Sequence, residues 1–493
     1  MNFARDVLQA QPADRLALVE LARDGARREW TFGEVEERSA RMAGALAQRD
    51  VGRGDVVMTM IGNRAEWVWT MMACFRTGAV ALPCTEQLRA KDLRLRLRVA
   101  CPSLIVADER NRAELDAARP DCPVLLVGDE SPLRSGDSPF AELDGADPSL
   151  ITFTSGTAGE PKAVVHGQRY LYGQRVQAEQ WLGAQADDLV WCTAASGWSK
   201  SARNVFIAPW LMGAAALLHD ARFDPHERLE LIEREKVNVL CMAPTEYRVI
   251  AKRATLRPLP SLRGMVAAGE ALNPEVLKAW RQATGLDIRD GYGQTETGQM
   301  TGMEIDVKAR AGSMGRALAG VRLSVRDGEL VADPKSVPTF FLGYLGEGVV
   351  HQGDGSWTVE DRRDGGPWHT GDRVAEARDG YLRFEGRADD VIISAGYRIG
   401  PFEVESALVA HPAVAEAAAV SAPDEERGAV VRAVVVLRDG HDPSDQLKHE
   451  LQEHVKRETA PYKYPRIVEF AEELPKTASG KVRRAQLRGE TAP

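Results

Sequence analysis

Short apolar runs alternate with amphipathic stretches over roughly the first 290 residues, and this alternation constrains the fold more than any other feature. The runs with the length and β-branched content of buried strands are 56–61, 104–107, 124–127, 190–193, 214–218, 237–241 and 265–267. Helical stretches such as 225–235 and 274–284 lie between them. Because buried parallel strands are connected by helices, the pattern predicts an α/β fold.

A helix near the start of the chain is predicted from its first turn. Thr31 and Glu34 have the spacing of a capping box, in which each side chain accepts a backbone N–H of the other. Val35, Met42 and Leu46 then fall on one face at helical spacing, so this face should be buried.

The chain of 493 residues exceeds one ordinary hydrophobic core, so at least two domains are expected. Residues 312–384 alternate strands with glycine turns and predict a small β subdomain. A further unit follows Asp389, with helices at 401–410 and 444–456 and a strand at 430–437. We therefore predict a large domain, 1–388, of two α/β subdomains plus the β subdomain, and a small mobile α+β domain, 389–493.

Composition excludes several classes of function. The chain has 63 basic and 72 acidic residues in no blocks, a net charge of −9, which argues against a nucleic-acid partner. The N-terminus has no apolar signal core, and no apolar stretch is long enough to span a membrane, so a cytoplasmic location is expected. Six cysteines without a C-x-x-C pair and nine histidines without ligand spacing make a zinc site improbable.

One loop has the composition of a phosphate site. It follows the apolar segment 151–153 and consists of Thr154, Ser155, Gly156, Thr157, Ala158, Gly159, Glu160, Pro161 and Lys162. Glycines let backbone N–H groups turn toward an anion, hydroxyls add donors, and the lysine adds a mobile positive charge. The spacing is not that of a Walker A loop. Ala158 stands where a hydroxyl would add one more donor.

Four later segments accompany this loop: DGYGQTE at 290–296, TGD at 370–372, GRADD at 386–390 and PKTASGK at 475–481. Together the five segments resemble the acyl- and aryl-adenylating superfamily of CoA ligases, luciferases and peptide-synthetase adenylation domains. From 285 to 488 the chain is most similar to the medium-chain acyl-CoA synthetases. The resemblance implies that a carboxylate and Mg·ATP give an acyl-adenylate, from which CoA displaces AMP.

The resemblance also implies roles for individual residues. Tyr292 would stack on adenine and Asp290 would accept its amino group. Thr295 would donate to the α-phosphate, Glu296 would bind Mg²⁺, and Lys481 would meet the attacking carboxylate, so these three are the expected catalytic residues. The other implied ATP contacts are Gly269, Glu270, Ala271, Gly291, Gly293, Gln294, Asp372 and Arg387.

The acyl pocket is expected around Trp198, Phe206, Met265 and Gly293. Relatives specific for acetate carry a tryptophan where this chain has Gly293, so loss of that bulk should deepen the pocket. The Trp198 segment has no carboxylate for a substrate ammonium, which favours an uncharged acyl or aryl tail.

The C-terminal unit would bring two different segments to the same intermediate. Lys481 is implied in adenylation and Gly396 in the path of pantetheine, so the unit should rotate about a hinge at Asp389 between half-reactions. The implied CoA contacts are Gln87, Ala395, Gly396, Tyr397, Arg398, Arg427, Lys456, Tyr464 and Arg466.

The resulting hypothesis is a cytoplasmic, AMP-forming acid:CoA ligase that acts on a medium-chain fatty or aromatic acid. The sequence is compatible with a homodimer. Two alternatives stay open: an adenylating enzyme that loads an acyl carrier protein, and a catalytically silent nucleotide-binding relative. The first is distinguished by whether free CoA saturates the second step. The second is distinguished by pyrophosphate exchange.

Overall fold

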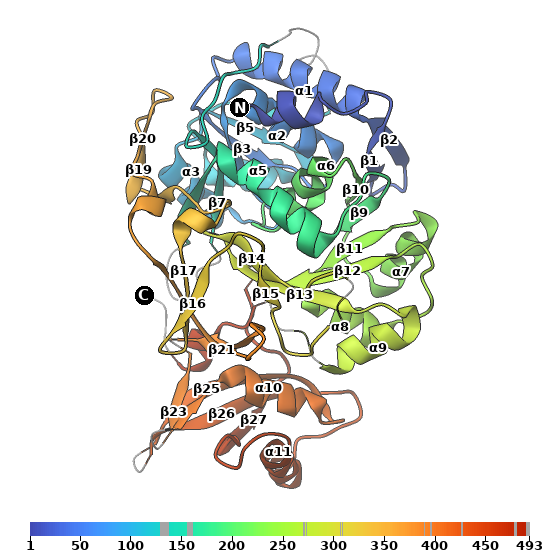
Figure 1. Ribbon diagram of the computed structural model, residues 1–493, viewed down its shortest axis with the longest axis vertical. Coiled ribbons are helices and arrows are strands. Elements are labelled where there is room, and N and C mark those ends of the chain that lie inside the picture. Colours follow the sequence, from blue (N-terminus) through green and yellow to red (C-terminus); the bar gives the residue numbers. More distant parts are fainter. Residues whose placement is uncertain are drawn as a thin grey trace.

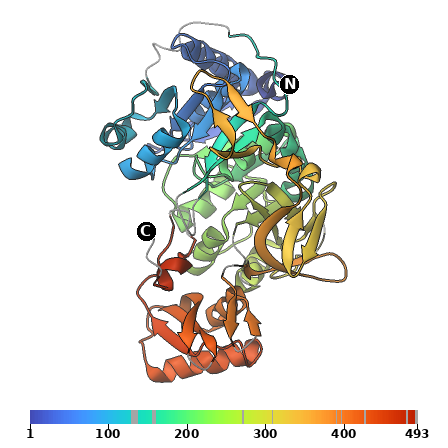
Figure 2. The ribbon, with the colours of Figure 1, turned by 90° about the vertical axis from the view of Figure 1, so that its left-hand side faces the viewer.

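The computed structural model describes residues 1–493 except 129–137, 155–160, 270, 271, 273, 306, 308, 389, 395, 396, 425, 426, 478–480 and 490–493. Figure 1 shows a large body built from the first four fifths of the chain and a smaller unit below it. The smaller unit carries the C-terminal colours and lies at one end of the large body in both views (Figures 1 and 2).

The first of two nine-stranded sheets has the strand order β15-β14-β13-β12-β11-β9-β10-β1-β2. Its core, β13-β12-β11-β9-β10-β1, is parallel, as the sequence predicted, and antiparallel strands lie at both edges. The strands are β1 (Leu16–Leu21), β2 (Arg27–Thr31), β9 (Leu189–Cys192), β10 (Ala215–His219), β11 (Val239–Met242), β12 (Gly264–Ala268), β13 (Ile288–Gln294), β14 (Gly298–Gly302) and β15 (Arg316–Ala317).

The second nine-stranded sheet has the order β20-β19-β18-β8-β7-β4-β3-β5-β6. Its strands are β3 (Val56–Met60), β4 (Val80–Pro83), β5 (Leu104–Ala107), β6 (Val124–Leu126), β7 (Pro148–Phe153), β8 (Ala163–Gly167), β18 (Gly343–Leu345), β19 (Gly348–His351) and β20 (Trp357–Val359). The phosphate-loop segment therefore joins the antiparallel neighbours β7 and β8.

The largest core cluster lies between these two sheets and the helices packed on them. It combines Leu18 and Val190 of the first sheet with Val57 and Ala81 of the second, all buried. The helices of the large body are α1 (Phe32–Ala47), α2 (Ala65–Thr77), α3 (Ala90–Ala100), α4 (Arg112–Ala118), α5 (Gln168–Gln177), α6 (Ala208–Leu211), α7 (Pro225–Arg234), α8 (Pro244–Arg253) and α9 (Pro274–Thr284). Helix α5 contacts both β8 and β14, so it lies between the sheets.

The capping box predicted for the first helix is confirmed. Thr31 is the N-cap of α1, its side chain accepts the N–H of Glu34, and Glu34 accepts the N–H of Thr31 at 2.8 Å. Val35, Met42 and Leu46 are buried, as their spacing predicted.

The β region between the two parts differs from the prediction. Only β16 (Leu323–Arg326), β17 (Glu329–Ala332), β21 (Trp368–Glu376) and β22 (Leu382–Arg387) form a separate four-stranded sheet. Residues 343–359 instead extend the second large sheet, because Gly343 and Tyr344 of β18 pair with Val165 and Val164 of β8. The assignment of this segment to the β subdomain was wrong.

The C-terminal unit has its own core cluster, which includes Val404, Val435 and Leu451. It contains β23 (Ile392–Ser394), β24 (Tyr397–Ile399), α10 (Pro401–Ala410), β25 (Val414–Asp424), β26 (Gly428–Leu437), α11 (Asp445–Glu458), β27 (Ile467–Phe470) and α12 (Arg484–Leu487). The predicted α/β class, with a large body and a small C-terminal unit, is confirmed. No helix in the described part of the chain is long and apolar enough to cross a membrane.

Candidate active site

A cavity of about 1670 Å³ lies where the large body meets the C-terminal unit. The carboxyl ends of β9, β10, β11 and β12 open into it, as is usual for ligand sites in open α/β sheets. Strands β13, β21 and β22 and residues of α10 and α12 form its other walls. The predicted site residues that line it are Gln87, Thr154, Lys162, Trp198, Gly269, Asp290, Gly291, Tyr292, Gly293, Gln294, Thr295, Glu296, Asp372, Arg387 and Lys481.

The DGYGQTE segment forms the end of β13 and the turn into β14. Gly293 faces Gln299 across this hairpin, at a bulge that follows Tyr292. A Cβ on Gly293 would lie 1.8 Å from the carbonyl oxygen of Gly298 and 2.9 Å from the Cα of Gln299, and both of these atoms belong to the backbone. Gly293 therefore permits close strand approach. An indole could not occupy this position without displacing β14, so the expectation that Gly293 simply deepens the pocket needs correction.

Two residues of β13 are tied to the separate four-stranded sheet. The Tyr292 hydroxyl donates to Asp372, and the Gln294 amide donates to Asp372 and to the carbonyl of Thr370, both at 2.8 Å. Trp368 Nε1 donates to the Gln294 Oε1 at 2.9 Å. The nucleotide-site residues of β13 and β21 are thus held in one hydrogen-bonded group.

Asp372 is a buried carboxylate with both hydrogen-bond donors and positive charges near it. Burial raises its pKa, although the Tyr292 hydrogen bond and the charges of Arg387 and Lys481 act against the rise. The Arg387 guanidinium lies 3.4 Å from Asp372 Oδ1. Burial and the neighbouring Asp372 raise the pKa of Tyr292 well above its ordinary value, so Tyr292 keeps its proton and can donate.

Tyr344 lies against both Glu296 and Lys162, the last residue of the predicted phosphate loop. Tyr344 donates to Glu296 Oε1 at 2.8 Å, and the Lys162 ammonium lies 4.6 Å from the centre of the Tyr344 ring. Thr154 and Lys162 close the base of the loop, because Thr154 N–H donates to the Lys162 carbonyl and Lys162 N–H to Thr154 Oγ1. Tyr344 was missed by the sequence analysis, since it follows no motif.

The predicted adenine edge combines Asp290 with the end of β12. Burial raises the pKa of Asp290 well above its ordinary value, and its carboxyl group accepts the N–H of Gly291 at 2.8 Å. Gly269 has φ of +102°, a conformation that suits glycine. Lys200 Nζ donates to the Ala268 carbonyl at 2.8 Å beside it. Lys200 also lines the cavity and was not predicted, although it stands two residues after Trp198.

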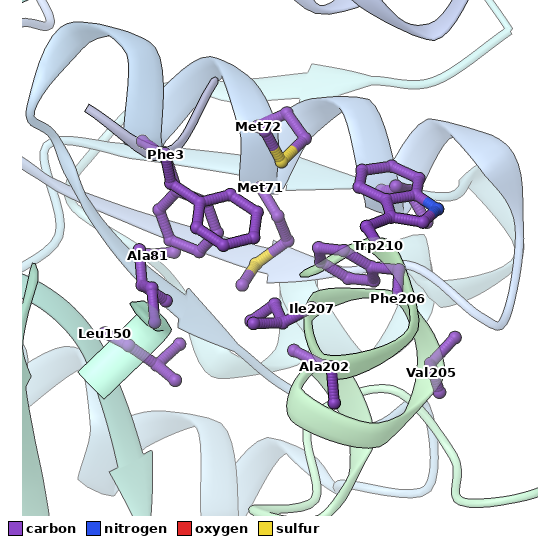
Figure 3. Packing of buried hydrophobic residues seen from close by; sticks show 14 of the residues in the cluster. Phe3, Met71, Met72, Ala81, Leu150, Ala202, Val205, Phe206, Ile207 and Trp210 are labelled. Carbon is purple, nitrogen blue, oxygen red and sulfur yellow. The ribbon is translucent and has the colours of Figure 1, made fainter. Parts of the chain in front are cut away.

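Two of the predicted acyl-pocket residues do not line the cavity. Phe206 is fully buried and packs at 5.5 Å from Trp67 and 5.1 Å from Trp210, between ring centres. Figure 3 shows Phe206 among the core side chains with Ile207 and Trp210. Met265 is also fully buried, in the core cluster on the other face of its sheet.

The predicted CoA contacts on the C-terminal unit that the structure describes do not line the cavity. The Lys456 ammonium and the Arg466 guanidinium lie 4.3 and 5.1 Å from the Tyr464 ring centre. Tyr397 is 53% exposed and stacks on Tyr462. Lys481 faces the cavity, and Tyr397 does not line it.

Arg427 also lies outside the cavity lining, and its N–H donates to Asp424. Some predicted residues lie outside the described part of the chain: Ser155, Gly156, Thr157, Ala158, Gly159, Glu160, Glu270, Ala271, Asp389, Ala395, Gly396 and the side chain of Arg398.

The sequence matches two family models. The model of the AMP-binding enzyme matches residues 4–345. The model of the AMP-binding enzyme C-terminal domain matches residues 403–481. The chain belongs to the AMP-binding enzyme family. The resemblance to the acyl-adenylating superfamily is thereby confirmed.

Relatives extend over almost the whole chain. The uncharacterized acyl–CoA ligase YtcI of Bacillus subtilis is 38% identical over 94% of this chain and 91% of its own. Human mitochondrial acyl-coenzyme A synthetase ACSM3 is 38% identical over 99% of this chain and 89% of its own. Among solved structures, the anthranilate CoA ligase AuaEII in complex with anthranoyl-AMP has a TM-score of 0.87 at 27% identity, covering 99% and 97% of the two chains.

Proposed function

We propose that this protein is an AMP-forming acid:CoA ligase that activates a medium-chain fatty or aromatic carboxylic acid. The observation that carries the proposal is the convergence on one cavity of Thr295, Glu296 and Lys481, with Asp372 and Tyr292 beside them. These residues come from the β13–β14 hairpin, β21 and the C-terminal unit, which are far apart in sequence. The relatives at 38% identity are named as acyl-CoA ligases or synthetases.

In the first half-reaction, a carboxylate oxygen attacks the α-phosphorus of ATP, the bond to the β-phosphate oxygen breaks, and pyrophosphate leaves. Negative charge moves onto the phosphate oxygens, so fixed donors and cations aimed at them lower the barrier. Thr295 is assigned to the α-phosphate. Lys481 is assigned to the attacking carboxylate and the α-phosphate, and Lys162 to the leaving phosphates.

The nucleoside is assigned to the hydrogen-bonded group on β13 and β21. The ring of Tyr292 offers a flat surface to adenine, and Asp290 faces its amino group. Asp372 is assigned to the ribose hydroxyls, with Arg387 beside it. Tyr292 donates to Asp372 in this structure, so the acceptor that ribose needs is already positioned.

Mg²⁺ is assigned to Glu296. Among the described residues no three His, Cys, Asp or Glu side chains converge on one point. A lone carboxylate still fits Mg²⁺ bound with a nucleotide, which usually takes one or two carboxylates and the substrate phosphates. Tyr344 donates to Oε1 of Glu296, so Oε2 would be available to the ion. The ion would supply neutralising charge to the phosphates.

In the second half-reaction, the CoA thiolate attacks the acyl carbon and AMP leaves. Lys481 faces the cavity in this structure, so the arrangement suits adenylation. Rotation of residues 389–493 about Asp389 against domain 1–388 would then bring the segment beside Tyr397 to the intermediate. Residues Lys456, Tyr464 and Arg466 would accompany it as a basic and aromatic surface for the CoA nucleotide. A cytoplasmic location and a homodimer stay predictions.

ATP–pyrophosphate exchange with a panel of acids tests the proposal. The panel contains fatty acids of increasing length and substituted benzoates, and the second step is followed by thioester formation against CoA concentration. We expect exchange with at least one medium-chain or aromatic acid, and saturation by free CoA. Exchange without any CoA thioester would favour a carrier-protein acceptor. A folded protein that exchanges with no acid would contradict the proposal.

A further inference from the structure

Two cations, the buried Arg203 and the half-buried Lys200, lie in the wall of the cavity that the acyl group would occupy. Lys200 and Arg203 both line it, near Trp198 and at the ends of β9 and β11. The positive charges of both residues act on the thiol of Cys241, in the strand β11. Neither residue has a role in the proposed chemistry of ATP.

Arg203 has no counter-ion among the residues that the structure describes. It begins the short π-helix η5 (Arg203–Ile207), whose Val205, Phe206 and Ile207 pack in the core shown in Figure 3. Arg203 is only 4% exposed, and its Nε has no hydrogen-bond partner. The Tyr170 hydroxyl interacts with its guanidinium.

No carboxylate of the described residues pairs with either cation, although the charge of Lys200 acts on the carboxyl group of Asp290, whose pKa burial still raises. Within the described residues, neither Lys200 nor Arg203 forms an ion pair within 4.0 Å, and Lys200 donates only to the Ala268 carbonyl. Glu246 lies on the same wall, but it accepts from Thr193 and faces Arg228 at 3.5 Å. His166, behind Arg203, is neutral at physiological pH because burial and Arg203 lower its pKa to about 3.

A buried guanidinium without a counter-ion is costly, since desolvation is not offset by an ion pair. A carboxylate on a ligand would offset that cost and match the planar fork of arginine in a bidentate manner. Gln299 lines the same cavity. Its Nε2 donates to the Thr301 carbonyl, and its Oε1 is buried and accepts no hydrogen bond from the described residues. This wall is therefore poorly suited to a purely apolar tail.

We propose that the acid substrate carries a second carboxylate, at the end remote from the reacting one, and that Arg203 and Lys200 bind it. This inference rests on the proposed function and narrows its substrate class to dicarboxylic acids, either aliphatic of medium length or aromatic. It replaces the expectation of an uncharged tail, which considered only the absence of an aspartate near Trp198. Arg203 and Lys200 act as specificity-determining residues.

The test compares acids that differ only at the remote end. Octanoate is compared with suberate, and benzoate with terephthalate, by kcat/KM for pyrophosphate exchange in the wild type, Arg203→Met, Arg203→Lys and Lys200→Met. We expect the wild type to prefer the diacid of each pair and Arg203→Met to lower that preference by roughly 10²-fold, the scale of losing one partner of a buried charge pair. Arg203→Lys should retain part of it.

The ratio of diacid to monoacid within one variant does not depend on how much of the protein is folded, so a partly unfolded variant still gives an answer. Arg326→Met, an exposed arginine of β16 outside this cavity, is the control for loss of a positive charge. It should leave the ratio unchanged.

Calorimetric titration of suberate and octanoate into the wild type and Arg203→Met measures the affinity of the site for each acid without catalysis. Tighter binding of suberate in the wild type alone supports the inference, even if no acid supports exchange and the proposed function fails. Activation of octanoate as efficient as that of suberate, with the ratio unaltered in Arg203→Met, would overturn the inference and leave the ligase proposal intact.

Discussion

Substitution of Gly293 by alanine tests the steric account of the β13–β14 hairpin. The added Cβ would lie 1.8 Å from the Gly298 carbonyl oxygen and 2.9 Å from the Gln299 Cα. Ordinary van der Waals contact needs roughly 3.5 Å, so the strands would have to separate by more than about 1 Å. Both contacting atoms are backbone, and no side chain can rotate away to make room.

The magnitude follows from two contributions. Overpacking of a well-packed site costs about 1–3 kcal/mol. Separation at Gly293 and Gln294 would weaken about two ladder hydrogen bonds to β14, at about 1 kcal/mol each. A loss of about 3–5 kcal/mol in the free energy of unfolding is expected, with an apparent Tm lower by roughly 4–6 °C.

Function should be lost along with stability. The hairpin positions Tyr292, Gln294, Thr295 and Glu296, so a shift of about 1 Å should lower pyrophosphate exchange by roughly 10²-fold even below the new Tm. Gly52→Ala is the matched control, because a Cβ there meets nothing within 4 Å and the φ of Gly52 is not positive. Thermal unfolding and exchange are measured on both variants. A Gly293→Ala protein as stable and active as Gly52→Ala would refute the reasoning.

Three further predictions concern single side chains. Glu296→Gln should lower adenylation by roughly 10²–10³-fold with an unchanged Tm, because it weakens Mg²⁺ binding; normal exchange in the folded variant would remove Glu296 from this role. Lys481→Ala should lower adenylation similarly yet still convert supplied acyl-adenylate and CoA to thioester, and equal loss in both half-reactions would contradict the division of roles. His166 has a pKa of about 3 when folded, against 6.5 when unfolded. The unfolded state therefore takes up the proton first, and stability should fall as pH drops from about 6.5 toward 3, by about 2 kcal/mol at pH 5. His166→Gln should remove this part of the dependence in denaturant unfolding at pH 7.5 and 5, and an identical pH difference in both proteins would count against it.

Local sequence patterns predicted the elements whose formation depends on local chemistry. The capping box at Thr31 and the Pro274 and Pro401 helix starts led to α1, α9 and α10. The apolar runs led to the parallel strands, since burial on both faces leaves a clear composition. The motifs also led to the residues that converge on the cavity.

Long-range contacts limited the rest of the prediction. Strands β18–β20 have the same turn-rich pattern as β16 and β17, and only pairing with β8 places them in another sheet. Phe206 and Arg203 lie three residues apart in η5, yet one packs in the core and the other lines the cavity. Composition alone could not show which side chain of η5 packs in the core and which lines the cavity. Tyr344 and Trp368 act through hydrogen bonds to distant partners, which no local pattern records.

Tyr292 and Gln294 donate hydrogen bonds to Asp372, and Trp368 donates one to Gln294. If the proposed nucleotide site is right, these bonds determine how short a fragment of this chain can be and still bind ATP. A fragment that ends at residue 345, with the first family match, would contain the phosphate loop and the DGYGQTE segment. It would lack the strand that carries Asp372 and Trp368, and with it the carboxylate of the proposed ribose site. ATP affinity therefore reports whether two separate sheets have docked on each other. The presence of the phosphate-loop and DGYGQTE segments alone does not guarantee that affinity.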